Sequence, residues 1–418
     1  MIRREVRPDG LTLLFEDVPG VRSAAIGVWL KLGSRHEPPR LSGICHFIEH
    51  LVFKGTETRT AQQISLLADR IGGNLDAFTS KEMTCFYARC LDEHLPVATD
   101  LVADIVRAPR FDAEELERER GVILEEIRMV NDAPEDRVYD LLAESIWPGH
   151  ALGRPIQGTE QTVSSISRDA VLRWFRRAYV PPNLVVAVAG RIGAANRRRI
   201  RRAFDGLRGG GEARRRGAPR FRPALVTEHR REIDQVHLML GLPALPAGDP
   251  ERYAQHLLNV ILGGSLSSRL FRRIREERGL VYSVSSSVQG YDGAGLLTVY
   301  AGTSPGKVRE VVAITLEEMH DLAARGPTRE EWEVARDHLK GNYMLALEST
   351  SNRMNRLARE QIVLGRQLAP EEILAELDRA TPERVHALAR RLFTRRRVAL
   401  AAVGRTRGLR LRERDLEL

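Results

Sequence analysis

The chain has 418 residues, more than one hydrophobic core usually organises, so two domains or lobes are expected. Its apolar fraction of 43% is that of an ordinary globular protein, without the run of about 18 apolar residues that predicts a membrane span. The net charge is +9, but its basic residues are spread along the chain and accompany no recognisable nucleic-acid-binding module. The first residues also lack the apolar segment of a signal peptide. We therefore expect a cytoplasmic protein with neither nucleic acid nor membrane as a partner.

The first informative segment is a predicted helix over residues 44–52, which follows an apolar strand expected over residues 24–32. It contains the motif His46-Phe47-Ile48-Glu49-His50. Histidines four residues apart lie on one helix face, about one turn apart, so both imidazoles can bind one ion. A catalytic zinc site commonly adds a carboxylate ligand and leaves the fourth position to water. Glu49 lies beside the second histidine and is the candidate general base for that water.

A second predicted helix, over residues 118–130, supplies candidate carboxylates. Glu119 and Glu126 are seven residues apart and share one face of this helix, whereas Glu125 points away. We expect Glu126 to be the third zinc ligand and Glu119 an auxiliary acid near the site, with one zinc ion per chain. The alternative for the charged run over residues 114–120 is an exposed helix face stabilised by ion pairs. The short motif also occurs by chance, so its co-occurrence with a distant acid is what supports a metal site.

The chain repeats its pattern of elements. A strand expected over residues 236–242 and a helix over 253–262 reproduce the order around His46, and His256 aligns with His46 at an offset of 210. Two further pairs of segments match at offsets of 216 and 214, namely residues 111–116 with 327–332 and residues 185–190 with 399–404. Three anchors at similar offsets predict an internal duplication.

The duplication predicts an α+β fold of two homologous α/β lobes, each an antiparallel-rich sheet flanked by helices. The expected division is an N-terminal metal-binding lobe over 1–206, a flexible Gly- and Arg-rich linker over 207–223 and a C-terminal lobe over 224–418. In the second half Asn342 takes the place of Glu126, and the base and second histidine are also missing. Only the first half can therefore hold the metal.

Several segments together resemble a known family. Residues 46–56 resemble the inverted zinc motif of the pitrilysin/insulinase metallopeptidases, in their mitochondrial-processing-peptidase-like branch. Glu126 follows His50 by 76 positions, close to where that family carries its glutamate ligand. Residues 72–80 resemble the edge strand on which the family's substrates lie, and residues 150–159 another typical stretch. Arg275 and Tyr282 resemble the family's Arg and Tyr pair, seven residues apart. The likeness runs from about residue 5 to residue 405.

The resemblance implies a zinc metalloendopeptidase that hydrolyses extended peptides or unfolded protein segments within an enclosed chamber, with water activated by Glu49. It implies that Tyr282 donates a hydrogen bond to the tetrahedral oxyanion and that Arg275 holds a substrate carbonyl. The peptide would add to the edge strand through main-chain hydrogen bonds. The residues expected to contact it are Asn74, Asp76, Ala77, Phe78, Thr79, Arg275 and Tyr282. Without the resemblance, the Arg and Tyr would be interpreted as ordinary surface and core.

The resemblance also bears on partners. In this branch two subunits face each other, and the Arg and Tyr of one complete the metal site of the other. This chain retains both sets of residues, so a homodimer is expected. The alternative is a non-catalytic scaffold or partner subunit of the same architecture. Asp76 stands where the family commonly has Asn, and its negative charge predicts a preference for basic substrates. Cys45, beside the first histidine, is expected to be a buried free thiol.

Overall fold

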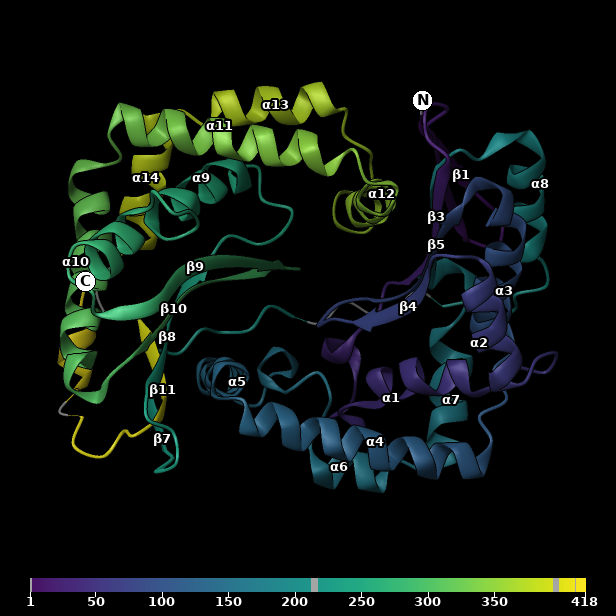
Figure 1. Cartoon of the computed structure of the whole chain (residues 1–418), viewed down its shortest axis with the longest axis horizontal. Coiled ribbons are helices and arrows are strands. Elements are labelled where there is room, and N and C mark those ends of the chain that lie inside the picture. The colour runs from purple at the N-terminus through teal and green to yellow at the C-terminus, as the bar shows by residue number, and fades with distance from the viewer. Residues whose placement is uncertain (1, 212–216, 394–397, 410) are drawn as a thin grey trace. The chain divides into compact units, whose positions relative to one another are not determined.

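The computed structural model describes residues 2–211, 217–393, 398–409 and 411–418. The chain forms two compact units, each with one sheet and its own set of helices (Figure 1). Unit 1 comprises residues Met1–Arg128, Arg154–Arg216 and Met344–Gln367, and unit 2 comprises Met129–Gly153, Gly217–Tyr343 and Leu368–Leu418. Of the predicted linker, residues 212–216 lie outside the described residues. No helix in the described part of the chain is long and apolar enough to cross a membrane.

Unit 1 contains a six-stranded sheet with the order β1-β2-β6-β3-β5-β4. Its strands are β1 (Ile2–Val6), β2 (Thr12–Asp17), β3 (Ser23–Leu30), β4 (Asn74–Thr79), β5 (Thr84–Leu91) and β6 (Leu184–Gly190). Strands β2 and β6 are parallel and all other neighbours are antiparallel. Strand β4 pairs only with β5, so one row of its main-chain N–H and C=O groups has no partner strand within the sheet.

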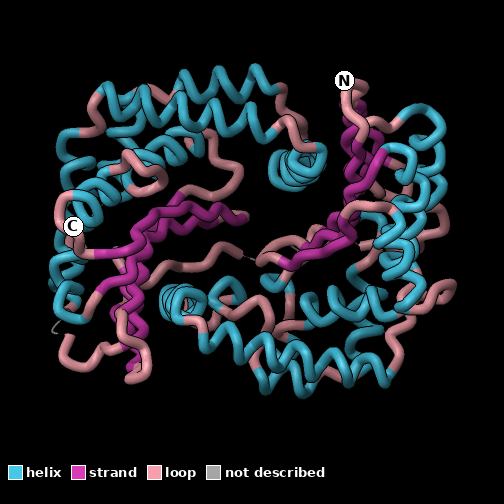
Figure 2. Tube along the Cα trace, in the orientation of Figure 1, coloured by secondary structure: helices cyan, strands magenta, loops and turns pink. Residues whose placement is uncertain are grey.

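Helices cover both faces of this sheet (Figure 2). They are α1 (Ile44–Leu51), α2 (Ala61–Arg70), α3 (Leu95–Arg107), α4 (Ala113–Asp132, whose last residues fall in unit 2), α6 (Glu160–Ser165), α7 (Arg168–Ala178), α8 (Gly193–Ala203) and α12 (Thr350–Leu364). The N-terminal helices build the core on one face, whereas α12 covers the other face with Met354, Leu357 and Ala358. Successive strand residues point to opposite faces, so each apolar strand contributes side chains to the cores on both faces of the sheet.

Unit 2 contains a five-stranded sheet with the order β7-β11-β8-β10-β9. Its strands are β7 (Leu225–His229), β8 (Val236–Ala244), β9 (Val281–Tyr291), β10 (Ala294–Thr303) and β11 (Ala399–Gly404). Its helices are α5 (Pro134–Ile146), α9 (Arg252–Leu262), α10 (Val308–Arg325), α11 (Arg329–Ala346, whose last residues fall in unit 1), α13 (Pro370–Arg379) and α14 (Pro382–Leu392). Helices α9, α10 and α14 build the core on one face, and α5 covers the other.

The two sheets share one topology. The order β2-β6-β3-β5-β4 of unit 1 matches β7-β11-β8-β10-β9 of unit 2, including one parallel pair, so the predicted homology of the two lobes is confirmed. The compact units depart from the predicted halves because α5 joins the second sheet and α12 joins the first. The apolar pattern of a helix indicates which face it buries, but not which sheet receives that face.

Candidate metal centre

Helix α1 presents the sequence motif on its polar face. Ile44, Phe47, Ile48 and Leu51 recur at the helical period and are buried in the core of unit 1. The remaining face carries the two histidines and Glu49, all of which are partly exposed. Burial of the apolar face therefore fixes the direction in which the motif's polar side chains point.

The two histidines meet a carboxylate from α4. Nε2 of His46 and Nε2 of His50 each lie 3.6 Å from Oε2 of Glu126. The ligand atoms of these three residues all lie within 4.8 Å of one another, and in the described residues they form the one group of this kind. A tetrahedral zinc ion with bonds of about 2.1 Å separates its ligand atoms by roughly 3.4 Å. The donor set and its spacing thus fit one zinc ion.

The environments of the two imidazoles differ. Burial, with a smaller contribution from the neighbouring His50, lowers the pKa of His46 to about 4, so its ring is neutral at pH 7 and can act as a ligand. Nδ1 of His50 lies 3.2 Å from Oε2 of Glu119, which orients that ring toward Glu126. Nδ1 of His46 is buried and has no hydrogen-bond partner in the part of the chain that the structure describes.

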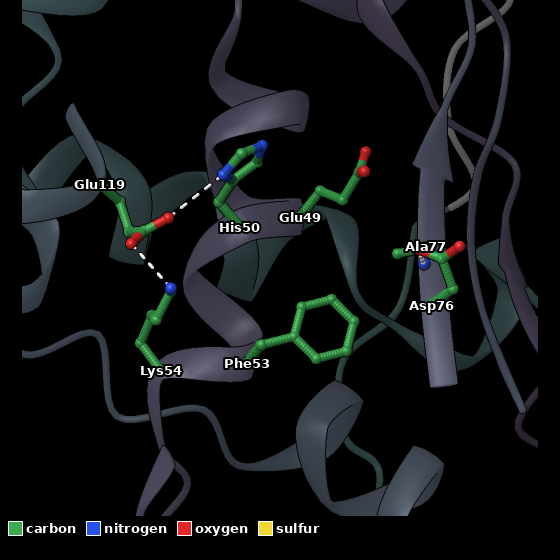
Figure 3. Close-up of a pocket in the computed structure, with 7 residues that line it drawn as sticks. All are labelled: Glu49, His50, Phe53, Lys54, Asp76, Ala77 and Glu119. Carbon is green, nitrogen blue, oxygen red and sulfur yellow. Dashed lines mark hydrogen bonds and ion pairs between the residues drawn. The ribbon is translucent and has the colours of Figure 1, made fainter. Parts of the chain in front are cut away.

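Glu119 lies behind the metal group. It is 6% exposed, and its Oε1 lies 2.7 Å from Nζ of Lys54, so one carboxylate joins a histidine and a lysine (Figure 3). The structure therefore places Glu119 beside the site, where the sequence predicted an auxiliary acid. Lys54 was not foreseen. Its position four residues after His50 was the available signal, because helical spacing returns it to the same side of the chain.

Glu49 lies next to the group without joining it. Its Oε2 accepts a hydrogen bond of 2.5 Å from the Thr79 hydroxyl of β4. Burial raises the pKa of the Glu49 carboxyl, and the nearby negative charges of Asp76 and Glu126 add to this effect, although the Thr79 hydrogen bond opposes it. A carboxylate with a raised pKa is a better proton acceptor, so this environment suits a general base.

Other acids of α4 point to solvent. Glu125 is exposed and pairs with Arg128, as its predicted orientation required. Arg118 pairs with Glu114 and Glu115, and Arg120 pairs with Glu117. The charged run over residues 114–120 is thus an ion-paired surface for most of its length, and of the acids of α4 Glu119 and Glu126 turn toward α1.

A cavity of about 210 Å³ adjoins the site between α1 and β4 (Figure 3). It is lined by Glu49, His50, Phe53, Lys54, Asp76, Ala77 and Glu119. Phe78 points to the other face of the sheet, where its ring lies 5.4 Å from that of Trp29, while Asn74 is exposed. Asp76 accepts a hydrogen bond of 3.3 Å from the Tyr87 hydroxyl and has no cationic partner among the described residues. The predicted substrate residues of β4 are therefore divided between two faces of the strand.

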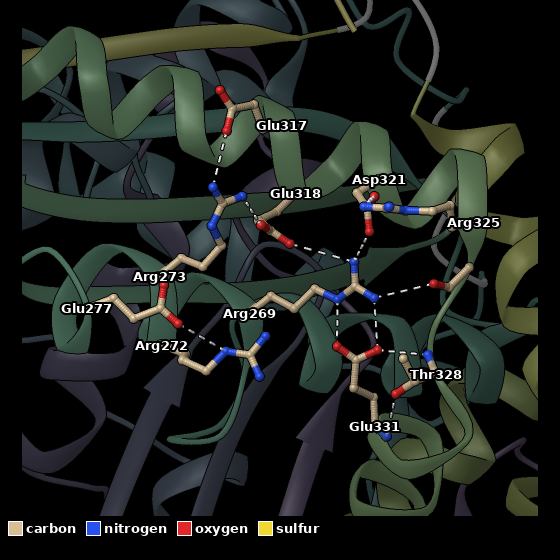
Figure 4. Close-up of polar contacts among 11 residues, drawn as sticks. Arg269, Arg272, Arg273, Glu277, Glu317, Glu318, Asp321, Arg325, Thr328 and Glu331 are labelled. Atoms are coloured by element: carbon tan, nitrogen blue, oxygen red, sulfur yellow. Dashed lines mark hydrogen bonds and ion pairs between the residues drawn. The ribbon is translucent and has the colours of Figure 1, made fainter.

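Arg275 and Tyr282 lie in unit 2. Arg275 belongs to a π-helical segment, Phe271–Glu276, and its guanidinium carbon lies 4.8 Å from the ring centre of Phe271 and 5.5 Å from that of Tyr282. The arginines just before it are paired: Arg269 with Asp321 and Glu331, Arg272 with Glu277, and Arg273 with Glu317 and Glu318 (Figure 4). Arg275 has no acidic partner in the described chain, and Tyr282 is 80% exposed. The guanidinium and the phenol are thus held together and remain available to a ligand.

The repeat positions carry no metal group. Asn342 of α11 is exposed, and its Nδ2 lies 3.0 Å from Nε2 of His338. Asn259 of α9, in place of the base, accepts a hydrogen bond from the Ser286 hydroxyl. The second lobe keeps the elements of the first lobe but uses these positions for local polar contacts.

Two homologous α+β lobes, one of which gathers two histidines and a glutamate of the kind found in catalytic zinc sites, define the class of the protein. The model of the family "Insulinase (Peptidase family M16)" matches residues 12–160, and that of the "Peptidase M16 inactive domain" matches residues 165–339. The chain therefore belongs to the insulinase family, peptidase family M16.

Individual relatives agree with this assignment. The chain is 42% identical to the uncharacterized zinc protease YmxG of Bacillus subtilis, over 94% of this chain and 96% of that protein. It is 41% identical to an uncharacterized zinc protease of Streptomyces coelicolor, over 96% and 89% of the two chains.

Solved structures share the fold. A peptidase M16 inactive domain from Pseudomonas fluorescens superposes with a TM-score of 0.89 at 19% identity, over 97% of this chain and 98% of that one. A protease from Helicobacter pylori superposes with a TM-score of 0.88 at 20% identity, over 97% and 99% of the two chains.

Proposed function

We propose that the protein is a zinc-dependent endopeptidase that hydrolyses extended peptides or unfolded protein segments within an enclosed chamber. The observation that carries this proposal is the convergence of His46, His50 and Glu126 beside a carboxylate, Glu49, that takes no part in the group. The relatives' description as zinc proteases supports the choice of metal. Zinc bound by one such group per chain would supply Lewis-acid polarisation of the scissile carbonyl and of the attacking water.

The protein's own residues supply the proton transfer. Glu49, with its raised pKa, accepts the proton of the attacking water and returns it to the leaving amine. The Thr79 hydroxyl holds this carboxylate by a hydrogen bond and keeps it directed toward β4. Glu119 orients His50 from behind, so its part in catalysis is indirect.

The substrate peptide lies along β4 in an extended conformation. The unpaired edge of this strand offers main-chain donors and acceptors, which bind a peptide with little demand on its sequence. Asn74, Asp76, Ala77, Phe78 and Thr79 belong to this strand, and the adjoining cavity accommodates a side chain of the bound peptide. The carboxylate of Asp76, which contacts the Tyr87 hydroxyl and has no cationic partner in the described chain, favours basic side chains of the peptide that lie beside it.

Arg275 and Tyr282 act on the same substrate. The Tyr282 hydroxyl donates to the oxyanion of the tetrahedral intermediate, and Arg275 holds a substrate carbonyl on the leaving side. The protein works as a homodimer in which this pair from one subunit completes the site of the other. Support comes from the exposed phenol and from the guanidinium, which is stacked on two rings but not paired with an acid among the described residues.

The alternative is a non-catalytic scaffold of the same architecture. The name of the second matching family model, an inactive domain, agrees with a second lobe that lacks the metal residues. The complete set in the first lobe, together with a general base in a suitable environment, favours an enzyme.

The test combines metal analysis with peptide hydrolysis. We expect purified wild-type protein to contain one zinc ion per chain and to cleave an unstructured peptide library, and His46→Ala to lose both properties. Glu49→Gln should keep the metal and lose about 10²- to 10⁴-fold in kcat. Zinc-loaded wild type without any cleavage would favour the scaffold, and full activity of Glu49→Gln would contradict the proposed mechanism.

A further inference from the structure

Helix α1 begins without a capping side chain of its own. Its N-cap residue is Gly43, which has a positive φ of 95° and makes no side-chain cap hydrogen bond. The first N–H groups of a helix still need acceptors. Glu37 provides two such acceptors, because its Oε2 accepts from the Gly43 N–H at 2.8 Å and its Oε1 accepts from the Cys45 N–H at 2.8 Å. Both oxygens of one carboxylate are thus bound to the start of the helix that carries His46.

Local packing explains why the cap comes from a distant residue. A Cβ atom at Gly43 would lie 2.3 Å from the carbonyl oxygen of Gln157, and one at Gly158 would lie 2.3 Å from that of Ser42. The start of α1 and residues 157–158 are therefore in direct main-chain contact. This leaves no room for a capping Ser, Thr or Asp at position 43, whose positive φ also disfavours such residues.

Glu37 is held in a buried polar network. It is 0% exposed, and Nη2 of Arg154 donates to its main-chain oxygen at 2.7 Å. Nζ of Lys81 donates in turn to the main-chain oxygen of Arg154, and the buried Arg35 pairs with Glu82. Burying charged groups in this way costs free energy, and apolar residues of similar size often stabilise a core at least as well. The proposed reaction uses none of these side chains, so the network needs another explanation.

The two histidines differ in how they are oriented. His50 is oriented by Glu119 through its Nδ1 atom, whereas Nδ1 of His46 has no hydrogen-bond partner in the described chain. Metal-binding histidines are normally held by a partner on the second ring nitrogen. The position of His46 therefore depends on packing, including the ring of His50 at 4.7 Å, and on its main chain, which lies in the helical turn that Glu37 holds.

We propose that Glu37 is a positioning residue of the zinc site, and that its carboxylate fixes the first turn of α1 so that His46 is presented to the metal. This inference rests on the proposed function insofar as it assumes that His46 binds zinc. It also gives a role to residues 150–159, in which Arg154 and Gly158 hold Glu37 and the start of α1 from the other side.

The test compares two buried glutamates of unit 1. Glu37→Gln keeps the size of the side chain, but an amide has one acceptor oxygen and loses one of the two N–H bonds. Glu16→Gln is the matched control, because Glu16 is 7% exposed and ion-paired with Arg353 and Arg356 of α12, not with α1. Zinc affinity is measured by chelator competition, and the geometry of the site by the visible absorption spectrum of the Co²⁺-substituted protein.

We expect Glu37→Gln to weaken zinc binding about 10- to 100-fold, the range seen when residues supporting a ligand are changed. Its Co²⁺ spectrum should differ from that of the wild type, and kcat should fall while KM stays unchanged. Glu16→Gln should keep wild-type affinity and spectrum even if its Tm falls. Wild-type affinity and spectrum in Glu37→Gln, or an equal loss in Glu16→Gln, would overturn the proposal.

If Glu37→Gln does not fold, amide hydrogen exchange of the wild-type protein tests whether Glu37 holds the start of α1. The Gly43 and Cys45 amides should exchange hydrogen slowly with and without zinc, and rapid exchange of both would overturn the proposal. Because metal binding and exchange are measured without peptide, these results are independent of the proposed reaction. A protein that binds zinc as described but cleaves no peptide would contradict only the proposed function.

Discussion

The two lobes of this chain share a strand order and an arrangement of helices, yet among the described residues only the first lobe gathers metal-binding side chains. Helix α4 carries Glu126 toward α1, whereas α11 carries Asn342 at the matching position, exposed and bonded to a neighbouring histidine. The second lobe instead presents an arginine without an acidic partner in the described chain and an exposed tyrosine. Under the proposed mechanism this duplicated fold divides one chemical task, because the scaffold is retained while few side chains decide what each copy does.

The lobes also share a packing arrangement that their sequences do not suggest. Each sheet is covered on one face by a helix from the other half of the chain, α12 on the first and α5 on the second. In each case a glycine of the matching central strand lies under that helix. A Cβ atom would lie 2.7 Å from Sδ of Met354 at Gly27 and 2.9 Å from Cδ2 of Leu142 at Gly241. In both lobes, the helix from the other half of the chain thus packs closely against a glycine of the central strand.

The largest expected effect comes from the ligand that distinguishes α4 from α11. Glu126→Gln should abolish stoichiometric zinc binding and peptide hydrolysis, because an amide oxygen is a poorer zinc ligand than a carboxylate. Glu125→Gln, which changes the adjacent exposed acid, is the control and should leave both unchanged. Metal analysis and a peptide assay measure the difference. Equal zinc content in the two variants would contradict the assignment of Glu126, rather than Glu125, to the face of α4 that binds the metal.

The next effect tests the contribution of the second lobe. Tyr282→Phe should lower kcat about 10²- to 10³-fold with zinc content unchanged, as expected for the loss of one hydrogen bond to an oxyanion. Tyr253→Phe removes a hydroxyl in the same unit that interacts with Arg252, and it should have little effect. Steady-state kinetics on one peptide separate the two variants. If Tyr282→Phe retained wild-type kcat, the second lobe would not take part in this way.

A smaller effect is expected from the acid behind the site. Glu119→Gln should weaken zinc binding about 10- to 100-fold, because His50 loses a charged partner on its Nδ1 atom. Glu117→Gln alters an exposed acid of the same helix, paired with Arg120, and should bind zinc as the wild type does. Chelator competition measures both affinities. Identical zinc affinities of Glu119→Gln and Glu117→Gln would show that Glu119 does not support zinc binding by His50.

The smallest effect concerns substrate preference. Asp76→Asn should reduce the preference for basic over acidic peptides about fivefold, the equivalent of the roughly 1 kcal/mol between unit charges about 4 Å apart in water. Cleavage rates for matched peptides with lysine or glutamate near the scissile bond measure this ratio. An unchanged ratio would remove Asp76 as a source of specificity.

The sequence was sufficient for elements whose signal is local. The strand expected over residues 24–32 is β3 (Ser23–Leu30), and the helix expected over 44–52 is α1 (Ile44–Leu51). The shared face of Glu119 and Glu126 followed from helical geometry alone, and both lie beside His50. The spacing of the motif and the distant acid thus predicted which side chains converge.

Features that depend on packing between distant segments could not be predicted. The sequence did not predict that α5, from the first half of the chain, packs on the second sheet and that α12, from the second half, packs on the first. The apolar face of a helix does not specify which sheet it covers. The hydrogen bond from Thr79 to Glu49 and the cap that Glu37 provides were also missed, since each depends on how far one loop or strand approaches α1. Phe53 and Lys54, which line the cavity, lie within the matched motif of residues 46–56, but the sequence alone predicted no role for them.

The most direct test of the account is anomalous X-ray diffraction at the zinc absorption edge from crystals of the protein purified with its metal. We predict one peak per chain, within bonding distance of Nε2 of His46, Nε2 of His50 and a carboxylate oxygen of Glu126, and no peak beside His256 or Asn342. A zinc peak at the second lobe, or none at these three residues in zinc-loaded protein, would contradict the division of roles between the two lobes.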